Sequence, residues 1–404
     1  MTNDELMQTG KEYIMNTYGR FPIALEKGQG SKVWDIEGKE YIDFTTGLAV
    51  TSLGHAHPAV VKAISEQCSR IIHSSNLYWI KPQIELAELL VENSDFDKVF
   101  FANSGAEVNE GAIKLARKHN KLKYCSDRYE IITMEQSFHG RTMATLTATG
   151  QEKFHKGFEP LLEGFKYVPF NDFEALAKAI SDRTCAVMLE LIQGEGGVRP
   201  ADKQYIKKVE KLCQEKDLLL IVDEVQSGIG RTGTMFAYQS YNIKPQIMTL
   251  AKALGNGTAI GALLAVDEVA QSFQPGDHAS TFGGNFVACA AAKAVIETMI
   301  NEELPARALG SGKYLINSLE KLKGEFPEII EEVRGLGLLV GIEVKCESIP
   351  LVKKAMENGL LLSAAGARVV RFLPPLNVDK QIIDEAVDIF KGVLAAGKED
   401  KNET

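Results

Sequence analysis

The sequence predicts an α/β protein with a large, mostly parallel sheet, followed by a smaller α+β domain. Over residues 50–300, short continuous apolar segments alternate with amphipathic segments. Continuous apolar segments are typical of parallel strands buried on both faces, and their alternation with helices is typical of βαβ units. After residue 305 the pattern changes, and at 404 residues the chain is long enough for more than one domain.

Five apolar segments are the expected strands of the large sheet. They are DKVFFA (97–102), YEIITME (129–135), CAVMLELI (185–192), LLLIVDE (218–224) and QIMTLAK (246–252). Amphipathic segments such as NEGAIKLARKHN (109–120) and DKQYIKKVEKLCQEKD (202–217) lie between them and predict helices. We expect residues 51–304 to form this large domain.

Residues 305–404 predict a smaller α+β domain. A long helix is expected over 305–322, strands in 334–344 and 359–378, a helix near 350–358 and a closing helix from 378. Residues 1–50 contain WDIEGKEY, a hairpin-like segment, and we expect this N-terminal part to pack beside the small domain.

Composition narrows the class of function. The formal net charge is −9 and the pI about 5.5, which argues against a nucleic-acid or anionic-membrane binder. No run of about 18 apolar residues predicts a membrane span, and the polar start does not resemble a signal peptide. The six cysteines form no C-x-x-C pair, so we expect a cytoplasmic protein with neither a zinc site nor disulfides.

The segment LLLIVDEVQSGIGRTG (218–233) ends a buried strand with two carboxylates, Asp223 and Glu224. Its glycines spell G-x-G-x-x-G, which suggests a nicotinamide-dependent oxidoreductase as one alternative. In a dinucleotide site, however, the glycines follow the strand directly and an acidic residue lies about 20 positions later. Here three residues intervene, and residues 225–266 contain no Asp or Glu before Asp267. The dinucleotide interpretation is therefore disfavoured, and Asp223 needs another partner.

Chemically useful residues follow the other strands, where ligands of open parallel sheets collect. Ser104-x-x-Glu107 predicts a helix cap, and such a helix N-terminus attracts phosphate, although a plain cap explains the same residues. QSFHGRT (136–142) supplies an aromatic ring and Arg141, whose planar fork suits a carboxylate unless it is a plain surface arginine.

Lys252 follows the last of these strands. If desolvated, its amine becomes neutral and nucleophilic, whereas the alternative is a solvent-exposed lysine. A phosphate-binding turn, an aromatic plane, a buried acid, a lysine and arginines together suit pyridoxal phosphate. Its aldehyde reacts with a lysine, and its pyridine nitrogen needs a buried acid such as Asp223 to stay protonated. Glu224 is then a structural neighbour.

The ordered motifs resemble one family over nearly the whole chain, from about Trp34 to Asn377. They are WDIEGKEYIDFTTGLAV, LGHAHP, FANSGAEVNEGAIKLARK, FHGRTMATLTATGQEKF, FKYVPFND, IQGEGGV, VDEVQSGIGRTG, TLAKALGNG, STFGGN, RGLGLLVGIE and VVRFLPPL. The chain resembles the class III, pyridoxal-phosphate-dependent aminotransferases of fold type I, most closely those acting on acetylornithine. This resemblance implies a pyridoxal 5'-phosphate enzyme and a homodimer with shared active sites.

The resemblance also implies roles for residues at the cofactor. Lys252 is similar to the lysine that forms a Schiff base, Asp223 to the residue facing the pyridine nitrogen, and Gln226 to the residue near the ring hydroxyl. Further residues resemble a phosphate-binding turn, a ring-stacking aromatic and a phosphate ligand from the second subunit. The phosphate-binding turn is Ser104, Gly105 and Ala106. The ring-stacking aromatic is Phe138, and the phosphate ligand from the second subunit is Thr281.

For the substrates, Arg141 and Arg371 match two carboxylate-binding arginines, Glu195 resembles the glutamate that pairs with Arg371, and Ser280 lies near substrate. The implied reaction moves the distal amino group of N2-acetylornithine to 2-oxoglutarate. Ornithine, succinylornithine and 4-aminobutyrate remain alternative donors, and an aminomutase or a non-catalytic binding protein remains open.

Three positions depart from the family pattern, namely Leu191, Ala253 and Asn256. None of the changes removes a chemical group, so we expect them to affect substrate details. The pair His55 and His57 suggests a structural turn rather than a metal site, and His139 is expected to support its loop.

Overall fold

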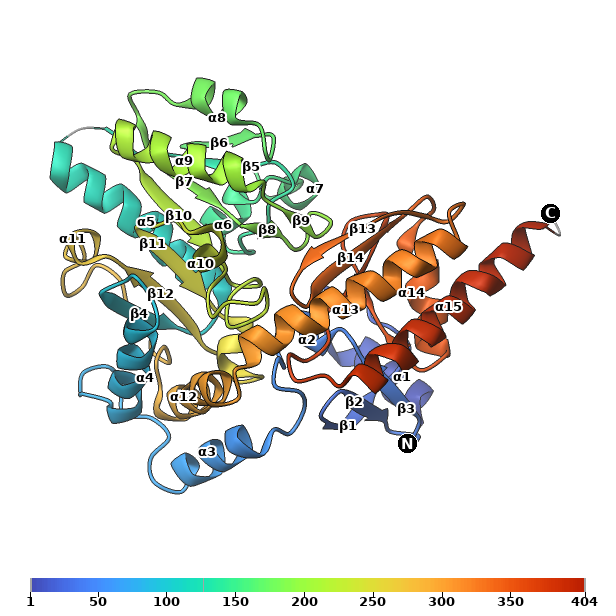
Figure 1. The fold of residues 1–404 in the computed structure, drawn as a ribbon. Helices are drawn as coiled ribbons and strands as arrows, with labels where there is room; N and C mark the ends of the chain where they lie inside the picture. The colour runs from blue at the N-terminus through green and yellow to red at the C-terminus, as the bar shows by residue number, and fades with distance from the viewer. Residues whose placement is uncertain (1, 126, 403–404) are drawn as a thin grey trace.

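The computed structural model describes residues 2–125 and 127–402, and Figure 1 shows two sheet-containing parts side by side. The first part is built on one seven-stranded sheet, which we call the large sheet. The second carries two four-stranded sheets. The domain boundaries at residues 50 and 304 stay a prediction, since strand pairing alone does not identify independent folding units.

The large sheet has the strand order β4-β12-β11-β10-β7-β5-β6. In that order the bounds are Lys98–Ala102, Gly261–Ala265, Ile247–Leu250, Leu219–Asp223, Thr184–Leu189, Glu130–Met134 and Phe165–Val168. β12 runs antiparallel to both β11 and β4, whereas the pairs from β11 to β6 are parallel. All five predicted strands are present, and β6 and β12 are additions to the prediction.

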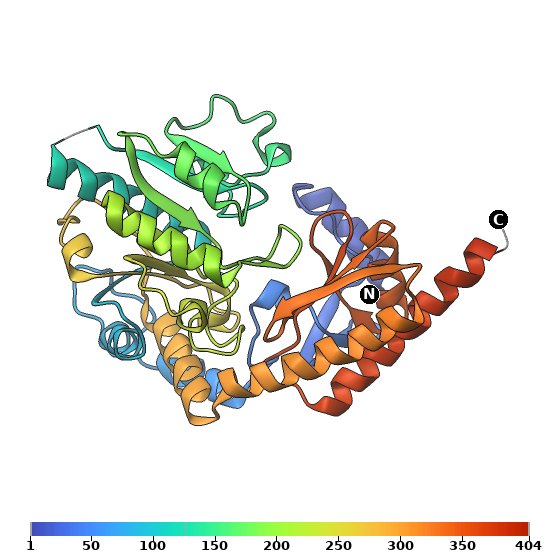
Figure 2. The same ribbon diagram turned by 45° about the horizontal axis from the view of Figure 1, so that its top comes forward.

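Helices cover both faces of the large sheet (Figure 2). α5 (Gly105–Tyr124) packs Val108, Ala112 and Leu115 against one face, in a cluster with sheet residues such as Ile221. α9 (Lys203–Lys216) and α12 (Phe286–Asn301) contribute to the cluster on the other face. The strands β4, β5, β7, β10 and β11 run in one direction, so the loops that follow them leave the same edge of the sheet.

The C-terminal sheet has the order β13-β14-β17-β16. Its bounds are Ile330–Leu336, Leu339–Val344, Val369–Phe372 and Ser363–Ala364. α13 (Leu304–Glu325), α14 (Ser348–Glu357) and α15 (Lys380–Asn402) lie beside it, as Figure 1 shows. The helices predicted for this part are thus present.

The N-terminal sheet joins the two ends of the chain. Its order is β1-β2-β3-β15, with bounds Leu25–Gln29, Lys32–Asp35, Glu40–Asp43 and Leu360–Leu361. β2 and β3 form the predicted hairpin, and β3 pairs in parallel with β15. The first part of the chain therefore lies against its last part.

The remaining elements connect these sheets. They are α1 (Asn3–Tyr13), α2 (Thr46–Ala49), α3 (Pro58–Cys68), α4 (Lys81–Glu92), α6 (Met143–Ala148), α7 (Glu152–His155), α8 (Phe173–Ala179), β8 (Ile192–Gln193), β9 (Arg199–Pro200), α10 (Ala237–Tyr241), the 3₁₀ helix η1 (Lys252–Gly255) and α11 (Asp267–Ala270). Among the described residues, no helix has the length and apolar character that a membrane span requires.

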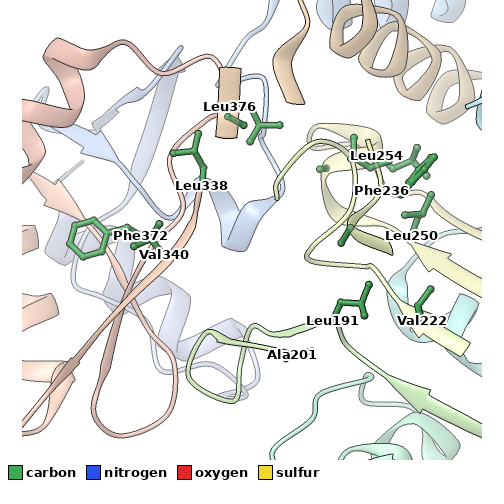
Figure 3. Packing of buried hydrophobic residues seen from close by; sticks show 14 of the residues in the cluster. Leu191, Ala201, Val222, Phe236, Leu250, Leu254, Leu338, Val340, Phe372 and Leu376 are labelled. Carbon is green, nitrogen blue, oxygen red and sulfur yellow. The ribbon is translucent and has the colours of Figure 1, made fainter. Parts of the chain in front are cut away.

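One hydrophobic cluster extends through both parts. Figure 3 shows Val222 and Leu250 of the large sheet on one side and Val340 and Phe372 of the C-terminal sheet on the other. Arg231 also joins the parts, because its buried guanidinium donates to the carbonyl oxygens of Leu338 and Pro374 and to Ser52 Oγ. Burial lowers the pKa of Arg231 to about 9.

Candidate active site

A cavity of about 440 Å³ lies where the loops after β4, β5, β7, β10 and β11 meet. This volume is in the range of small-molecule sites. The lining includes nine of the residues predicted from the sequence: Ser104, Gly105, Ala106, Phe138, Arg141, Glu195, Asp223, Gln226 and Lys252. The structure therefore brings together side chains that are far apart in the chain.

Lys252 enters the cavity from the first residue of η1, where its backbone has a φ of 45°. Burial lowers the pKa of its amine, while the negative charge of Glu195 opposes this shift. No other described residue forms a hydrogen bond with its amine nitrogen. A desolvated amine without a partner can become a nucleophile or a general base.

Asp223 is buried at the end of β10 and held by three donors. Its Oδ2 accepts hydrogen bonds from His139 Nδ1 at 2.8 Å and from Asn109 Nδ2 at 2.7 Å. Its Oδ1 accepts one from the Val225 amide at 3.0 Å. The neighbouring Glu224 instead accepts from the amides of Ala237 and Tyr238 at the start of α10.

Two of these contacts escaped the sequence analysis. The sequence predicts only a loop-supporting role for His139 and a place in an amphipathic helix for Asn109. A polar residue beside the apolar positions Val108 and Ala112 of α5 was the available signal for Asn109. His139 Nε2 is buried without a hydrogen-bond partner among the described residues, so the ring is held through Nδ1.

The N-terminus of α5 borders the cavity. Ser104 is its N-cap, and Ser104 Oγ accepts from the Glu107 amide at 3.3 Å. In the predicted capping box the Glu107 carboxylate would accept a hydrogen bond from the Ser104 amide. In the structure it accepts one from the Asn103 amide instead, at 2.7 Å. Within the described chain, the amides of Gly105 and Ala106 have no hydrogen-bond acceptor. The helix end thus presents free donors that suit an anion.

Arg371 lies behind the cavity wall on β17. Its Nη1 donates to Glu195 Oε1 at 2.7 Å, to Gln226 Oε1 at 3.0 Å and to the Gly194 carbonyl at 2.9 Å. Arg371 is absent from the residues that line the cavity, whereas Glu195 and Gln226 are among them. Glu195 therefore covers the guanidinium.

Electrostatics favour this ion pair. Burial raises the pKa of Glu195, but the charges of Arg371 and Lys252 outweigh burial and leave it below its ordinary value. Arg371 Nη2 is buried and has no hydrogen-bond partner in the described part of the chain. One donor of this guanidinium is therefore unused while Glu195 covers it.

Phe138 and Arg141 also line the cavity. The exposed Arg141 guanidinium lies 3.8 Å from the ring centroid of Phe154 and 5.3 Å from that of Phe138. The Phe138 amide donates to the carboxyl group of Glu190 at 2.9 Å. Burial raises the pKa of Glu190 to about 7, and this cavity residue is an addition to the predicted site.

Ser280 and Thr281 lie apart from the other predicted residues. Ser280 Oγ accepts from Asn103 Nδ2 at 2.9 Å, at the edge of the cavity. Thr281 is exposed and does not line the cavity of its own chain. This placement leaves its expected role in a second subunit untested.

The glycines of the G-x-G-x-x-G segment serve packing. Gly230 and Gly233 have φ values of +83° and +106°, and an added Cβ would lie 3.0 Å from Leu376 Cδ1 and 2.9 Å from Leu309 Cβ, respectively. The turn thus faces the C-terminal part, with no open surface for a dinucleotide at these positions.

The other positions discussed from the sequence have structural contacts. His55 Nε2 pairs with Asp43 Oδ2 at 2.8 Å. Asn256 Oδ1 accepts from the Leu53 amide at 2.8 Å, and Leu191 and Ala253 are buried in the hydrophobic cluster. The three departures from the family pattern therefore fill structural positions.

Known proteins match the chain along its length. The family model "Aminotransferase class-III" matches residues 13–394. An acetylornithine aminotransferase of Caldanaerobacter subterraneus is 56% identical, covering 95% of this chain and 98% of the relative. An acetylornithine aminotransferase of Methanothermobacter thermautotrophicus is 50% identical, and the match covers 98% of this chain and 100% of that relative.

Solved structures agree with these relatives. The ornithine aminotransferase of Toxoplasma gondii, solved with partial occupancy of PLP at its active site, has a TM-score of 0.95 at 32% identity, with 99% of this chain and 96% of that chain covered. Fold type I and the cofactor pyridoxal 5'-phosphate are thereby indicated for this chain, in agreement with the sequence analysis. The chain belongs to the class III aminotransferases, a family of pyridoxal-phosphate-dependent enzymes that transfer an amino group from a donor to a keto acid.

Proposed function

We propose that the enzyme transfers the distal amino group of N2-acetylornithine to 2-oxoglutarate, giving N-acetylglutamate 5-semialdehyde and glutamate for arginine biosynthesis. The names of the relatives at 56% and 50% identity support this donor. The observation that carries the proposal is the ion pair of Arg371 with Glu195, at 2.7 Å beside the cavity of Lys252. A covered arginine lets one site accept acids with one carboxylate and with two.

The cavity residues fit the cofactor. The free amides of Gly105 and Ala106, with Ser104, would hold its phosphate at the helix N-terminus. Phe138 would stack on its ring, and Gln226 would lie near the ring hydroxyl. Asp223 is buried, and its carboxyl group is held by His139 and Asn109, which suits a partner for a protonated ring nitrogen.

Lys252 is the proposed catalytic base. When bound, pyridoxal 5'-phosphate supplies a ring that withdraws electrons from the substrate carbon next to the nitrogen. Lys252 Nζ takes the proton from that carbon, because burial favours the neutral amine. The η1 backbone keeps this base beside the reacting bond, so proximity contributes to the rate.

The two arginines divide the substrate carboxylates. Arg141 takes the carboxylate far from the reacting carbon in both half-reactions. Arg371 takes the α-carboxylate of glutamate, and Glu195 neutralises Arg371 when the amine donor is bound. This arrangement avoids leaving a buried arginine without a partner. Ser280 would contact substrate at the cavity edge.

The proposed exchange at Arg371 can be tested with Glu195→Ala. We expect this substitution to slow the half-reaction with N2-acetylornithine more than the half-reaction with glutamate. Stopped-flow absorbance of the cofactor measures both rates. Unchanged rates in both half-reactions would refute the exchange.

We further propose a homodimer in which Thr281 of one subunit binds the cofactor phosphate of the other. Leu77, Trp79 and Phe282 are 86%, 89% and 62% exposed, and Asn76 Nδ2 donates to the Ser280 carbonyl, which brings the two segments together. Exposed apolar patches of this kind favour a protein partner. The free cysteines suit a reducing cytoplasm as the proposed location.

Shared sites predict complementation. Lys252→Ala and Thr281→Ala chains should each be weakly active, and remixing them should restore one complete site in each mixed dimer. Activity that does not recover, while capture through an affinity tag on one of the two chains demonstrates mixed dimers, would refute the role of Thr281.

Ornithine is the second candidate donor, since the Toxoplasma gondii neighbour is an ornithine aminotransferase. A panel of N2-acetylornithine, ornithine, succinylornithine and 4-aminobutyrate, each with 2-oxoglutarate, distinguishes these donors. The highest kcat/KM is expected for N2-acetylornithine. A higher value for another amine would replace the proposed substrate. A separate experiment tests the site itself: borohydride should attach the cofactor covalently to the wild-type chain at Lys252, and the Lys252→Ala chain should not be labelled.

A further inference from the structure

The loop that carries Glu195 is docked onto the C-terminal sheet. It connects β8 and β9, which lie next to the large sheet, and Figure 3 shows the segment from Leu191 to Ala201 between the two parts. Val198 at its end is buried in a cluster with Leu339 and Val369. A Cβ on Gly341 would lie 2.9 Å from Val198 Cβ, so glycine at 341 is what allows this close contact.

Arg334 of β13 binds this loop from outside the cavity. Its Nε donates to the Gly197 carbonyl at 3.0 Å and to the Val198 carbonyl at 3.2 Å, and its Nη2 donates to the Gly197 carbonyl at 2.7 Å. The Arg334 side chain is only 10% exposed, and its Nη1 pairs with Glu343 at 2.6 Å and also with Glu332. The carboxylates fix the guanidinium, so these bonds to the loop backbone are charge-assisted and oriented.

Two arginines of one sheet therefore bind the loop on either side of Gly196. Arg371 binds the Gly194 carbonyl and Glu195 on the cavity side, and Arg334 binds Gly197 and Val198 on the other. We propose that Arg334 is a positioning residue that keeps Glu195 on Arg371 and so limits how readily the site accepts a second carboxylate. This inference rests on the proposed assignment of that carboxylate to Arg371.

The physical reason is the cost of opening the loop. A dicarboxylate reaches Arg371 only after Glu195 has moved away, and the backbone two residues later is bound to Arg334. Without those bonds the loop has more conformations when open, so opening costs less free energy. The apparent affinity for a dicarboxylate then rises, because a larger fraction of the protein is competent to bind it.

The test compares two probes on the holoenzyme, glutarate with two carboxylates and pentanoate with one. Changes in the cofactor spectrum give both dissociation constants. We expect Arg334→Gln to lower the Kd of glutarate about 2- to 30-fold, the range typical of residues that modulate coupling without touching the ligand. The Kd of pentanoate should not change, and Arg334→Lys should give a smaller effect, since an ammonium lacks the planar fork.

Arg199→Gln is the matched control. Arg199 lies on β9 of the same hairpin and pairs with Glu343 at 3.7 Å, but within the described chain it donates no hydrogen bond to the Gly197 or Val198 carbonyl. This variant removes the same charge and should bind both probes like the wild type. The proposal would be overturned if the Kd of glutarate for Arg334→Gln were equal to, or higher than, its Kd for Arg199→Gln.

Equal weakening of both probes would also overturn it, because that result indicates general loosening of the cavity. The outcome is separable from the proposed function, since no amine donor is used. A wild type that fails to use N2-acetylornithine would refute the donor while leaving the Arg334 comparison valid. A wild type that binds glutarate no better than pentanoate would refute the assignment of Arg371.

Discussion

Gly105 provides a quantitative test of the anion-binding helix end. The Cβ of an alanine at 105 would lie 2.7 Å from Val225 Cγ1 and 3.0 Å from Val225 Cγ2. Ordinary contacts between such atoms begin at about 3.5 Å, so one of the two segments must move by several tenths of an ångström. Both Gly105 and Val225 line the cavity, and the movement would displace the free amides that face the phosphate.

Two effects of Gly105→Ala oppose each other. Alanine favours a helix over glycine by up to about 1 kcal/mol, which stabilises α5. Overpacking typically costs about 1–3 kcal/mol, and here the cost falls on the cavity wall. We therefore expect little change in melting temperature, but a Kd for pyridoxal 5'-phosphate that is about 5- to 150-fold higher, the ratio that corresponds to 1–3 kcal/mol.

Titration of the cofactor-free protein, followed by absorbance, measures this Kd. Val225→Ala removes both clashing methyl groups, so the double variant should recover most of the lost affinity. Gly111→Ala adds the same methyl group to the same helix, where the nearest atom is Leu263 Cδ1 at 3.1 Å, and serves as the control. Wild-type affinity in Gly105→Ala, or no recovery in the double variant, would refute the reasoning.

Three further predictions concern buried polar groups. Burial lowers the pKa of Lys252, so this lysine destabilises the folded state at pH values below its unfolded pKa of about 10.5. Lys252→Met should therefore raise the melting temperature of the cofactor-free protein at pH 7. The gain should shrink as the pH approaches 10.5. Burial raises the pKa of Glu190 from 4.5 to about 7, so its contribution to stability is complete below pH 4.5 and is lost as the pH rises through 7. Glu190→Gln should remove up to about 3 kcal/mol of that decline, and identical pH profiles of melting for variant and wild type would contradict this expectation. Asn109→Leu removes one hydrogen-bond partner from Asp223, from the His139 carbonyl and from the Thr249 hydroxyl. Each lost partner should cost about 1–3 kcal/mol of stability, so calorimetry should record a clearly lower melting temperature.

Much of the large sheet could be predicted because its parallel strands are apolar on both faces. β6 and β12 give a weaker signal, since FKYV has a lysine inside the strand and GALLA consists largely of small residues. The antiparallel direction of β12 follows from the connection through η1, which hydrophobic periodicity does not report. Element type was thus accessible from local pattern, and strand direction was not.

The same limit applies to the site. Lys252 and Asp223 were predicted because each follows an apolar strand, where ligands of such sheets bind. The contacts of Asp223 with His139 and Asn109 join residues 84 and 114 positions apart, and no local pattern indicates them. Arg334 is similar, because its importance comes from carbonyl groups 136 and 137 positions away.

The parallel pairing of β3 with β15 has a consequence for synthesis. β3 leaves the ribosome early, but its partner strand is made only when almost the whole chain has been translated. Until then its edge is unpaired, while the large sheet between them already has all its strands and can fold first. Nascent chains stalled before residue 360 should therefore expose the first 50 residues to protease, and release of the complete chain should protect them.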